Sequence, residues 1–165
     1  MMAVVDVVSE NGDWDSIPGL LPRVEQAVQA ALAASGVKLL PGAEISVLLS
    51  DDAEITELNG RWRGKPQPTN VLSFPAVTPD RLGTSPMIGD IILAYETCIR
   101  EAAEESKTLP DHLTHLAVHG ALHLMGFDHE TDAEAEAMEA LERKVLASLG
   151  VADPYADPAG PEART

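Results

Sequence analysis

The chain's five histidines all lie in one stretch of its C-terminal half: His112, His115, His119, His123 and His129. The last three belong to the segment HGALHLMGFDH, residues 119–129. On a helix, His119 and His123 are one turn apart and share a face. Gly126 can then adopt the left-handed conformation that ends a helix and turns the chain back, bringing His129 to the same place. Three imidazoles that leave one coordination position open are typical of a catalytic zinc site rather than a closed structural one.

The same histidine spacing occurs in zinc proteases, in which a glutamate follows the first histidine and acts as the general base. Here that position is Gly120, and no carboxylate occupies positions 120–122. A peptidase would therefore need another base. The acid nearest to the third histidine is Asp128, which has two interpretations. It either orients a ligand or relays a proton, or it is an ordinary turn or helix-capping aspartate.

A basic group lies outside the histidine segment, within RWRGKPQP, residues 61–68, where one glycine and two prolines predict a polar loop. Arg61, Arg63 and Lys65 could bind phosphates, and the indole of Trp62 could stack on an unpaired base. The alternative is a solvated loop in which Trp62 is a core anchor, and for Trp62 we favour burial because of its large apolar area. The chain carries 11 Lys+Arg against 27 Asp+Glu, a net charge of −16. Such a charge repels nucleic acid and anionic membranes at long range. A protein that binds nucleic acid despite this charge needs a local basic site, and this group is the candidate.

The elements that position these residues form an α+β fold with a mixed four-stranded sheet and about five helices. Short β-branched or apolar runs predict strands at 3–8, 44–50, 71–74 and 87–94. Helical periodicity and cap residues predict helices over 18–36, 51–58, 95–107, 110–125 and 132–149. The metal site thus falls on a helix of the C-terminal half and the turn that follows it. The segment 75–87 is expected to be a mobile connection.

The last predicted helix begins with a capping box, formed by Thr131 and Glu134. Its acids are expected on a solvated face: Asp132, Glu134, Glu136, Glu139 and Glu142. His112 and His115 lie outside the metal-binding pattern. We expect them to be exposed or packed residues of a helix, and the alternative is that they hydrogen-bond to and support the metal ligands.

The length of 165 residues predicts a single domain over 1–150, followed by a Pro- and Ala-rich tail over 151–165 that we expect to be disordered. Cys98 is the only cysteine and cannot form an internal disulfide, which suits a reducing cytoplasm. The chain has no apolar run near the ~18 residues of a membrane span, and its N-terminus lacks the basic region of a signal peptide.

Three segments together resemble the YbeY family, the bacterial single-strand-specific metallo-endoribonucleases of ribosomal RNA maturation. They are HGALHLMGFDH at 119–129, LNGRWRGKPQPTNVLSFP at 58–75 and GDIILA at 89–94. The resemblance implies a mixed sheet with packed helices and one zinc ion (Zn2+) held by His119, His123 and His129 plus a water. It also selects Arg63 as the functional arginine near the metal. At position 70 many family members have aspartate, whereas this chain has Asn70, which keeps an acceptor oxygen but loses the charge.

These observations predict a cytoplasmic, zinc-dependent, single-strand-specific endoribonuclease that acts in small-subunit rRNA 3′-end maturation and ribosome quality control. Arg63 and Asp128 are its candidate catalytic residues, and Arg61, Arg63 and Lys65 its candidate RNA-binding residues. Its expected partners are single-stranded rRNA, the small ribosomal subunit and assembly factors, with no DNA and no membrane. The first alternative is a ribosome-assembly binding protein whose zinc is mainly structural, and the second is a metallopeptidase with an unrecognised base.

Overall fold

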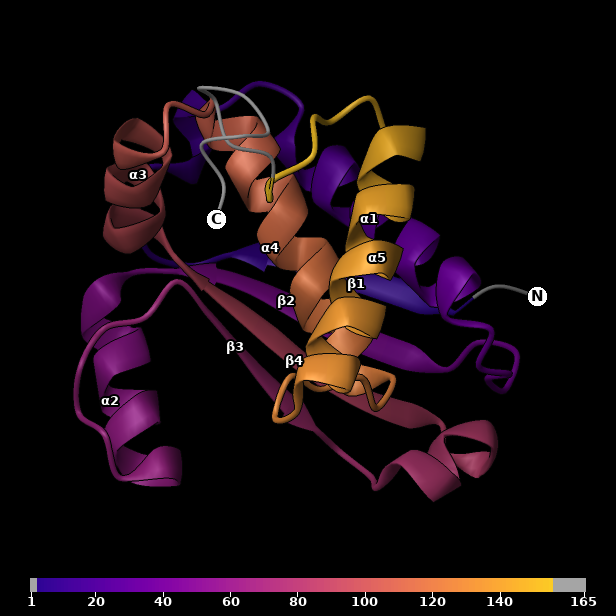
Figure 1. Cartoon of the computed structure of the whole chain (residues 1–165). Coiled ribbons are helices and arrows are strands. Elements are labelled where there is room, and N and C mark those ends of the chain that lie inside the picture. Colours follow the sequence, from indigo (N-terminus) through magenta and orange to yellow (C-terminus); the bar gives the residue numbers. More distant parts are fainter. Residues whose placement is uncertain (1–2, 156–165) are drawn as a thin grey trace.

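The computed structural model describes residues 3–155, which form one four-stranded mixed sheet surrounded by helices (Figure 1). The strand order is β1-β2-β4-β3, with β1 parallel to β2, β2 parallel to β4, and β3 antiparallel to β4. The strands are β1 (Val4–Ser9), β2 (Glu44–Ser50), β3 (Val71–Pro75) and β4 (Met87–Ala94). The predicted α+β class and mixed sheet are confirmed, and two of the strands have the predicted bounds.

Two helices, α1 (Leu20–Ser35) and α4 (Leu109–Leu124), pack on one face of the sheet, and α5 (Asp132–Ser148) packs on these two helices. Helix α4 contacts β3 and β4 on one side and α1 and α5 on the other. It is therefore buried along most of its length, which gives the histidines that it carries a rigid support. The remaining helices, α2 (Asp52–Arg63) and α3 (Tyr95–Glu104), follow β2 and β4 directly.

Side chains that alternate along the strands build two apolar clusters on opposite faces of the sheet. The main core contains Ile45 and Val47 of β2, packed with α1, α4 and α5. A smaller cluster on the other face joins Ile55 of α2 to Leu72 and Ile92. The larger core thus lies beneath the histidine helix, and α2 is held separately on the far face.

Helix α2 is longer than predicted, because it continues through Asn59 and Gly60 to Arg63. Gly64, with φ of 70°, ends the helix in the left-handed conformation. The Asn59 side chain is buried and donates to the carbonyl of Gln67 at 3.0 Å, so it supports the following loop instead of stopping the helix. The prediction that Arg61–Arg63 begin a loop is therefore wrong.

The connection expected to be mobile between 75 and 87 contains a 3-10 helix, η2 (Pro79–Thr84). Its Leu82 is buried in the main core, which ties this segment to the domain. A second 3-10 helix, η1 (Trp14–Ser16), places Trp14 in the same core.

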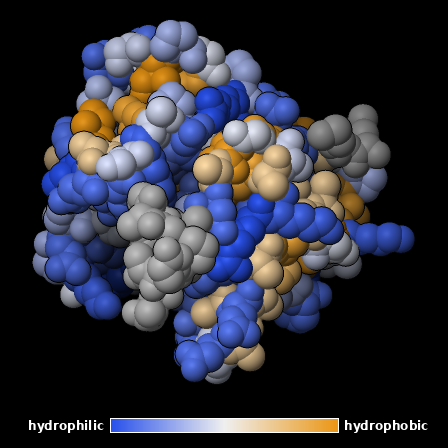
Figure 2. All heavy atoms as spheres, turned by 45° about the horizontal axis from the view of Figure 1, so that its top comes forward, coloured by the Kyte–Doolittle hydropathy of each residue, from blue (hydrophilic) through white to orange (hydrophobic). Residues whose placement is uncertain are grey.

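The division into a domain over 1–150 and a tail over 151–165 stays a prediction, because residues 156–165 lie outside the described part of the chain. Within that part, Val151 is already packed into the main core. Among residues 3–155, none of the helices combines the length and apolarity that a membrane crossing needs. Hydrophilic side chains cover much of the face seen in Figure 2, with apolar patches between them.

Candidate metal centre and cleft

The turn after α4 brings the third histidine of the motif back toward the first two. Gly126 has a φ of 98°, and its N–H donates to the carbonyl of His123 at 3.0 Å. The N–H of Phe127 donates to the carbonyl of Leu122 at 3.1 Å, which completes a Schellman ending. The ring of His129 consequently lies 5.2 Å from that of His123 between centroids, as the glycine in the motif predicted.

The nitrogen atoms of this cluster have a spacing that fits a metal ion. The Nε2 atoms of His119 and His123 are 3.1 Å apart. Two nitrogens bound to tetrahedral zinc at about 2.0–2.1 Å would lie about 3.3 Å apart. Ligand atoms of His123, Asp128 and His129 also lie within 4.8 Å of one another. Burial and the neighbouring His119 and His129 lower the pKa of His123, which favours the neutral imidazole that a metal requires.

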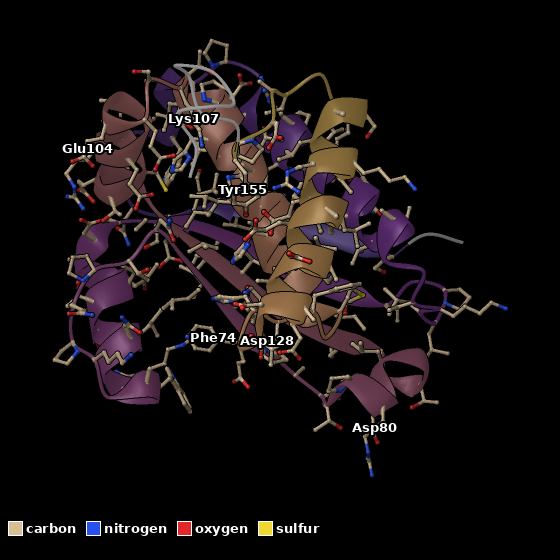
Figure 3. The ribbon with its side chains drawn as sticks, in the orientation of Figure 1. Phe74, Asp80, Glu104, Lys107, Asp128 and Tyr155 are labelled. Carbon is tan, nitrogen blue, oxygen red and sulfur yellow. The ribbon has the colours of Figure 1, made fainter. Side chains whose placement is uncertain are left out.

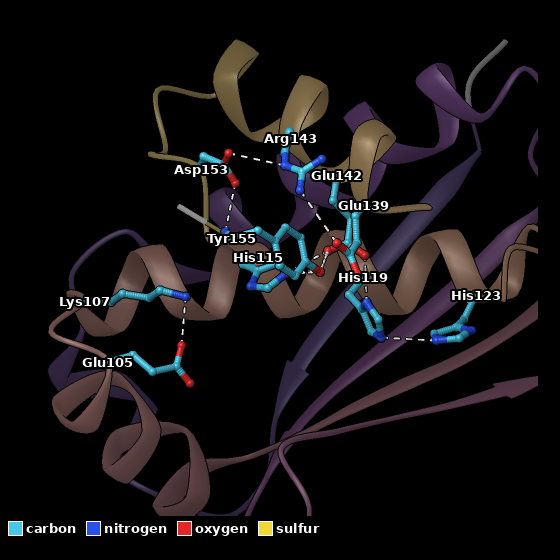
Figure 4. Close-up of polar contacts among 10 residues, drawn as sticks. All are labelled: Glu105, Lys107, His115, His119, His123, Glu139, Glu142, Arg143, Asp153 and Tyr155. Atoms are coloured by element: carbon cyan, nitrogen blue, oxygen red, sulfur yellow. Dashed lines mark hydrogen bonds and ion pairs between the residues drawn. The ribbon is translucent and has the colours of Figure 1, made fainter. Parts of the chain in front are cut away.

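A buried carboxylate on α5 determines which nitrogen of His119 is free. Glu142 Oε2 lies 2.8 Å from Nδ1 of His119, and because a carboxylate only accepts, Nδ1 carries the proton (Figure 4). The lone pair of His119 is then on Nε2, the atom that faces His123. Metal-binding histidines are commonly oriented by a carboxylate in this way.

Three donors converge on Glu142. Its Oε1 accepts from Nε2 of His115 at 2.8 Å and from the hydroxyl of Tyr155, while Oε2 accepts from His119. Glu142 has 0% of its surface exposed. Burial opposes its ionisation, but the hydrogen bonds from His115, His119 and Tyr155 outweigh burial and lower its pKa to about 2. Glu142 is thus an ionised, fully enclosed carboxylate.

The prediction that Glu142 lies on a solvated acidic face is wrong, because the side chain is buried. His115 contacts Glu142, the residue that orients His119, which agrees with the alternative of a supporting role for His115. The sequence does carry a signal for Glu142, because it shares a helix face with Met138, Val145 and Leu146, all of which are buried. An acid within an apolar stripe must find hydrogen-bond donors. Those donors lie on α4 and after α5, where helix periodicity alone cannot place them.

His112 belongs to a second polar network, beside the cleft. It is 2% exposed, and its Nε2 lies 2.9 Å from Oε1 of Glu101. The same Glu101 oxygen accepts from Nδ2 of Asn70 at 2.9 Å, and Oδ1 of Asn70 accepts from the N–H of Val71. The NH2 group and the oxygen of the Asn70 side chain therefore both form hydrogen bonds at the start of β3. An aspartate at position 70 would instead place a second carboxylate next to that of Glu101.

The histidine cluster opens into a cleft of about 610 Å3 between the end of α4 and strand β3. Its lining includes His119, His123, Asp128 and His129 on one side and Arg63 and Asn70 on the other. Figure 3 shows Asp128 at the end of the α4 and α5 pair, close to strand β3. The structure therefore brings the three predicted metal ligands and both candidate catalytic residues to one cavity.

The basic residues of 61–65 are not all directed to this cleft. A neighbouring pocket of about 460 Å3 shares Arg63 with the cleft and is also lined by Lys65. Arg61 lines neither cavity, and its guanidinium pairs with Glu57 at 2.6 Å. Trp62 is 66% exposed, so its predicted burial is wrong, and it borders a groove on the opposite face of the sheet. Of the three predicted RNA-binding residues, Arg63 lines both cavities and Lys65 lines only the neighbouring pocket.

The position that carries the base in zinc proteases faces the sheet in this protein. A Cβ at Gly120 would lie 2.9 Å from Cγ2 of Ile91 and 3.1 Å from Oγ of Ser73. Ser73 Oγ also donates to the Gly120 carbonyl at 3.1 Å. A glutamate at position 120 would have no room, which agrees with the absence of a protease-type base in the sequence.

The fold and the site define the chain as an α+β protein with a histidine-rich metal-binding group at the end of a buried helix. The model of the family described as Endoribonuclease YbeY matches residues 13–150. Endoribonuclease YbeY from Azorhizobium caulinodans is 53% identical over 156 residues, covering 94% of this chain and 98% of that protein. Endoribonuclease YbeY from Chelativorans sp. is 54% identical over 155 residues, covering 92% of this chain and 93% of that protein.

The solution structure of TM1509 from Thermotoga maritima has a similar fold, with a TM-score of 0.57 at 24% identity over 89% of this chain and 92% of that one. The chain belongs to the endoribonuclease YbeY family and is an enzyme of the hydrolase class. The family assignment drawn from the segments at 58–75, 89–94 and 119–129 is confirmed.

Proposed function

We propose that this protein is a zinc-dependent endoribonuclease that cleaves single-stranded RNA. One observation carries the proposal: His119 and His123 present paired Nε2 atoms 3.1 Å apart, with His119 oriented by Glu142, into a cleft that Arg63 also lines. This arrangement combines a candidate metal centre with a candidate phosphate-binding group. The family membership supports an RNA substrate.

His119, His123 and His129 would hold the ion and leave one position open to substrate or water. A zinc ion held there would supply Lewis acidity, polarising a phosphoryl oxygen or activating water near neutral pH. The guanidinium of Arg63 would bind the phosphate beside the reacting bond with two parallel hydrogen bonds. Asp128, which lines the cleft and lies near His123 and His129, would accept or return a proton.

The two joined cavities support a preference for unpaired RNA. Lys65 lines the neighbouring pocket, which also contains Arg63. An RNA strand that passes from the cleft across Arg63 would therefore meet a second cation in that pocket. Unpaired nucleotides can be splayed into such cavities, whereas a duplex presents only its backbone and shallow groove. Arg61 lies outside both cavities and would reach RNA only by leaving Glu57.

The net charge of −16 would confine RNA binding to this cleft and make it sensitive to salt. We infer that substrates are delivered by the small ribosomal subunit or its assembly factors, with action at the 3′ end of small-subunit rRNA and in ribosome quality control, in the cytoplasm. This part of the proposal is supported by the family resemblance and by the charge. Tight binding of free RNA at high salt would contradict delivery by a partner.

The test compares cleavage of a labelled single-stranded RNA and its duplex by wild type, Arg63→Ala and His123→Ala in zinc-buffered solution. We expect only the single strand to be cut, His123→Ala to be inactive, and Arg63→Ala to lose about 10- to 100-fold in kcat/KM because a charged hydrogen bond is lost. Zinc content should not change in Arg63→Ala. Arg100→Ala, which removes an exposed guanidinium on α3, is the matched control and should cleave like wild type.

Equal cleavage by all four proteins would identify a contaminant and reject the proposal. The alternative, a ribosome-assembly protein with a structural zinc, would then be favoured. Cleavage of a peptide that is abolished by His123→Ala would instead favour the metallopeptidase.

A further inference from the structure

The segment that follows α5 folds back toward the metal centre. Gly150, with φ of 78°, ends the helix, and the N–H of Val151 donates to the carbonyl of Leu146 at 2.9 Å. Val151 is buried, which fixes the direction in which the chain leaves α5. Four residues later Tyr155 reaches the carboxylate that orients His119 (Figure 4).

Several contacts hold the ring of Tyr155 in place. The Arg143 guanidinium lies over the ring, 5.2 Å from its centroid, and Nε of Arg143 is 3.3 Å from Asp153. Asp153 in turn accepts from the N–H of Tyr155 at 2.8 Å. The edge of the ring meets His115, with centroids 5.6 Å apart. The tyrosine is therefore positioned by contacts other than the hydrogen bond of its hydroxyl.

Among residues 3–155, the hydroxyl of Tyr155 has one carboxylate within hydrogen-bond distance. It donates to Oε1 of Glu142 and lies 3.4 Å from Nε2 of His115. Burial and the adjacent Glu142 raise the pKa of Tyr155 well above its usual value, so the hydroxyl stays a donor. A buried carboxylate depends on such donors, because an unpaired one would be strongly destabilised.

We propose that Tyr155 is a positioning residue of the metal centre, acting through Glu142 on His119. The inference rests on the proposed function, since it assigns a supporting role at the same zinc site. Tyr155 and His115 hold Oε1 of Glu142, which leaves Oε2 aimed at Nδ1 of His119 and keeps Nε2 of His119 free for the metal. A competing explanation is that Tyr155 only anchors the segment after α5 to the domain.

The test is Tyr155→Phe, which removes the hydroxyl and keeps the ring under Arg143. The control is Tyr95→Phe, at the only other tyrosine, whose ring packs edge-on against Trp14 with centroids 5.1 Å apart. The zinc Kd is measured by competition with a chromophoric chelator. We expect a roughly tenfold weaker Kd in Tyr155→Phe, the lower end of the effect of groups that orient metal ligands, and less than twofold in Tyr95→Phe.

A double-mutant comparison tests whether the effect passes through Glu142. In a Glu142→Gln background, Tyr155→Phe should change the zinc Kd little further, because the group through which it acts has already been altered. Full additivity of the two changes would overturn the inference. So would an unchanged zinc Kd in Tyr155→Phe accompanied by a lower Tm of the zinc-free protein, since that result describes an anchor. Wild-type protein that binds no zinc would overturn the proposed function together with this inference.

Discussion

Replacing Glu142 by glutamine removes one buried charge while leaving the side chain almost the same size. Three donors reach the two carboxylate oxygens: the rings of His115 and His119 and the hydroxyl of Tyr155. Glutamine offers one oxygen and one NH2 group. At least one donor must then face the NH2 group, and if that donor is Nδ1 of His119, its ring loses the hydrogen bond that fixes its tautomer.

The size of the effect follows from the pKa of Glu142, which lies at about 2 instead of 4.5. Each pKa unit corresponds to about 1.36 kcal/mol, so the folded state favours the carboxylate by about 3 kcal/mol. Because the folded pKa is depressed, this contribution is fully present above pH 4.5 and is lost as the pH falls toward 2. In a protein of this length we expect Tm to fall by about 6–12 °C at pH 7.

The assay is urea unfolding of zinc-free wild type and Glu142→Gln at several pH values from 7 down to 3. The control is Glu136→Gln, which removes the same charge from an exposed position on α5. The free energy of unfolding should differ by about 3 kcal/mol between wild type and Glu142→Gln at pH 7, and the difference should narrow below pH 4.5. Zinc affinity should also fall, by about 10- to 100-fold.

Two results would refute this reasoning. If Glu142→Gln were no less stable than Glu136→Gln, the hydrogen bonds to the Glu142 carboxylate would make no net contribution to the free energy of unfolding. If the difference between wild type and Glu142→Gln stayed constant from pH 7 to pH 3, ionisation of Glu142 would not be the source of the stability.

Two further predictions concern the helix that carries the ligands and the role of the metal. Gly120→Ala should destabilise the protein by about 1–3 kcal/mol in urea unfolding, because its Cβ would lie 2.9 Å from Ile91. If Gly120→Ala were as stable as wild type, α4 would have to be able to move away from the sheet. Removal of zinc by a chelator should leave the far-UV circular dichroism unchanged and lower Tm, because the main core contains none of the three predicted ligands. Unfolding of the whole chain on chelation would instead support a structural zinc.

Features of the site encoded by neighbouring residues could be predicted from the sequence. The approach of His129 to His123 depends only on helix spacing and on a glycine that adopts positive φ, both of which are local. The strands over 44–50 and 87–94 likewise have short apolar runs with clear ends. The predicted capping box of Thr131 and Glu134 is confirmed, since both of its hydrogen bonds are present.

Features that depend on distant partners could not be predicted in the same way. The burial of Glu142 is decided by donors on α4 and after α5, whereas its own helix has many exposed acids. The continuation of α2 past Asn59 and Gly60 depends on a loop that packs back, with Pro66 against Gly60 and Gln67 bonded to Asn59. Trp62 lies near the end of α2, where it borders the groove on the opposite face of the sheet and stays exposed.

The candidate metal centre has a consequence for the order in which the protein is made. Its three histidines, Glu142 and Tyr155 all come from residues 119–155, whereas Arg63 comes from α2, much earlier in the chain. All four strands are synthesised before α4. At about 5–20 residues per second, the face of the sheet that α4 covers therefore stays uncovered by α4 for a few seconds. The proposed zinc site cannot assemble until His129 has emerged, and the proposed support from Tyr155 cannot form until the end of that stretch has been made. A nascent chain therefore contains Arg63 before it contains the three histidines of the candidate metal centre.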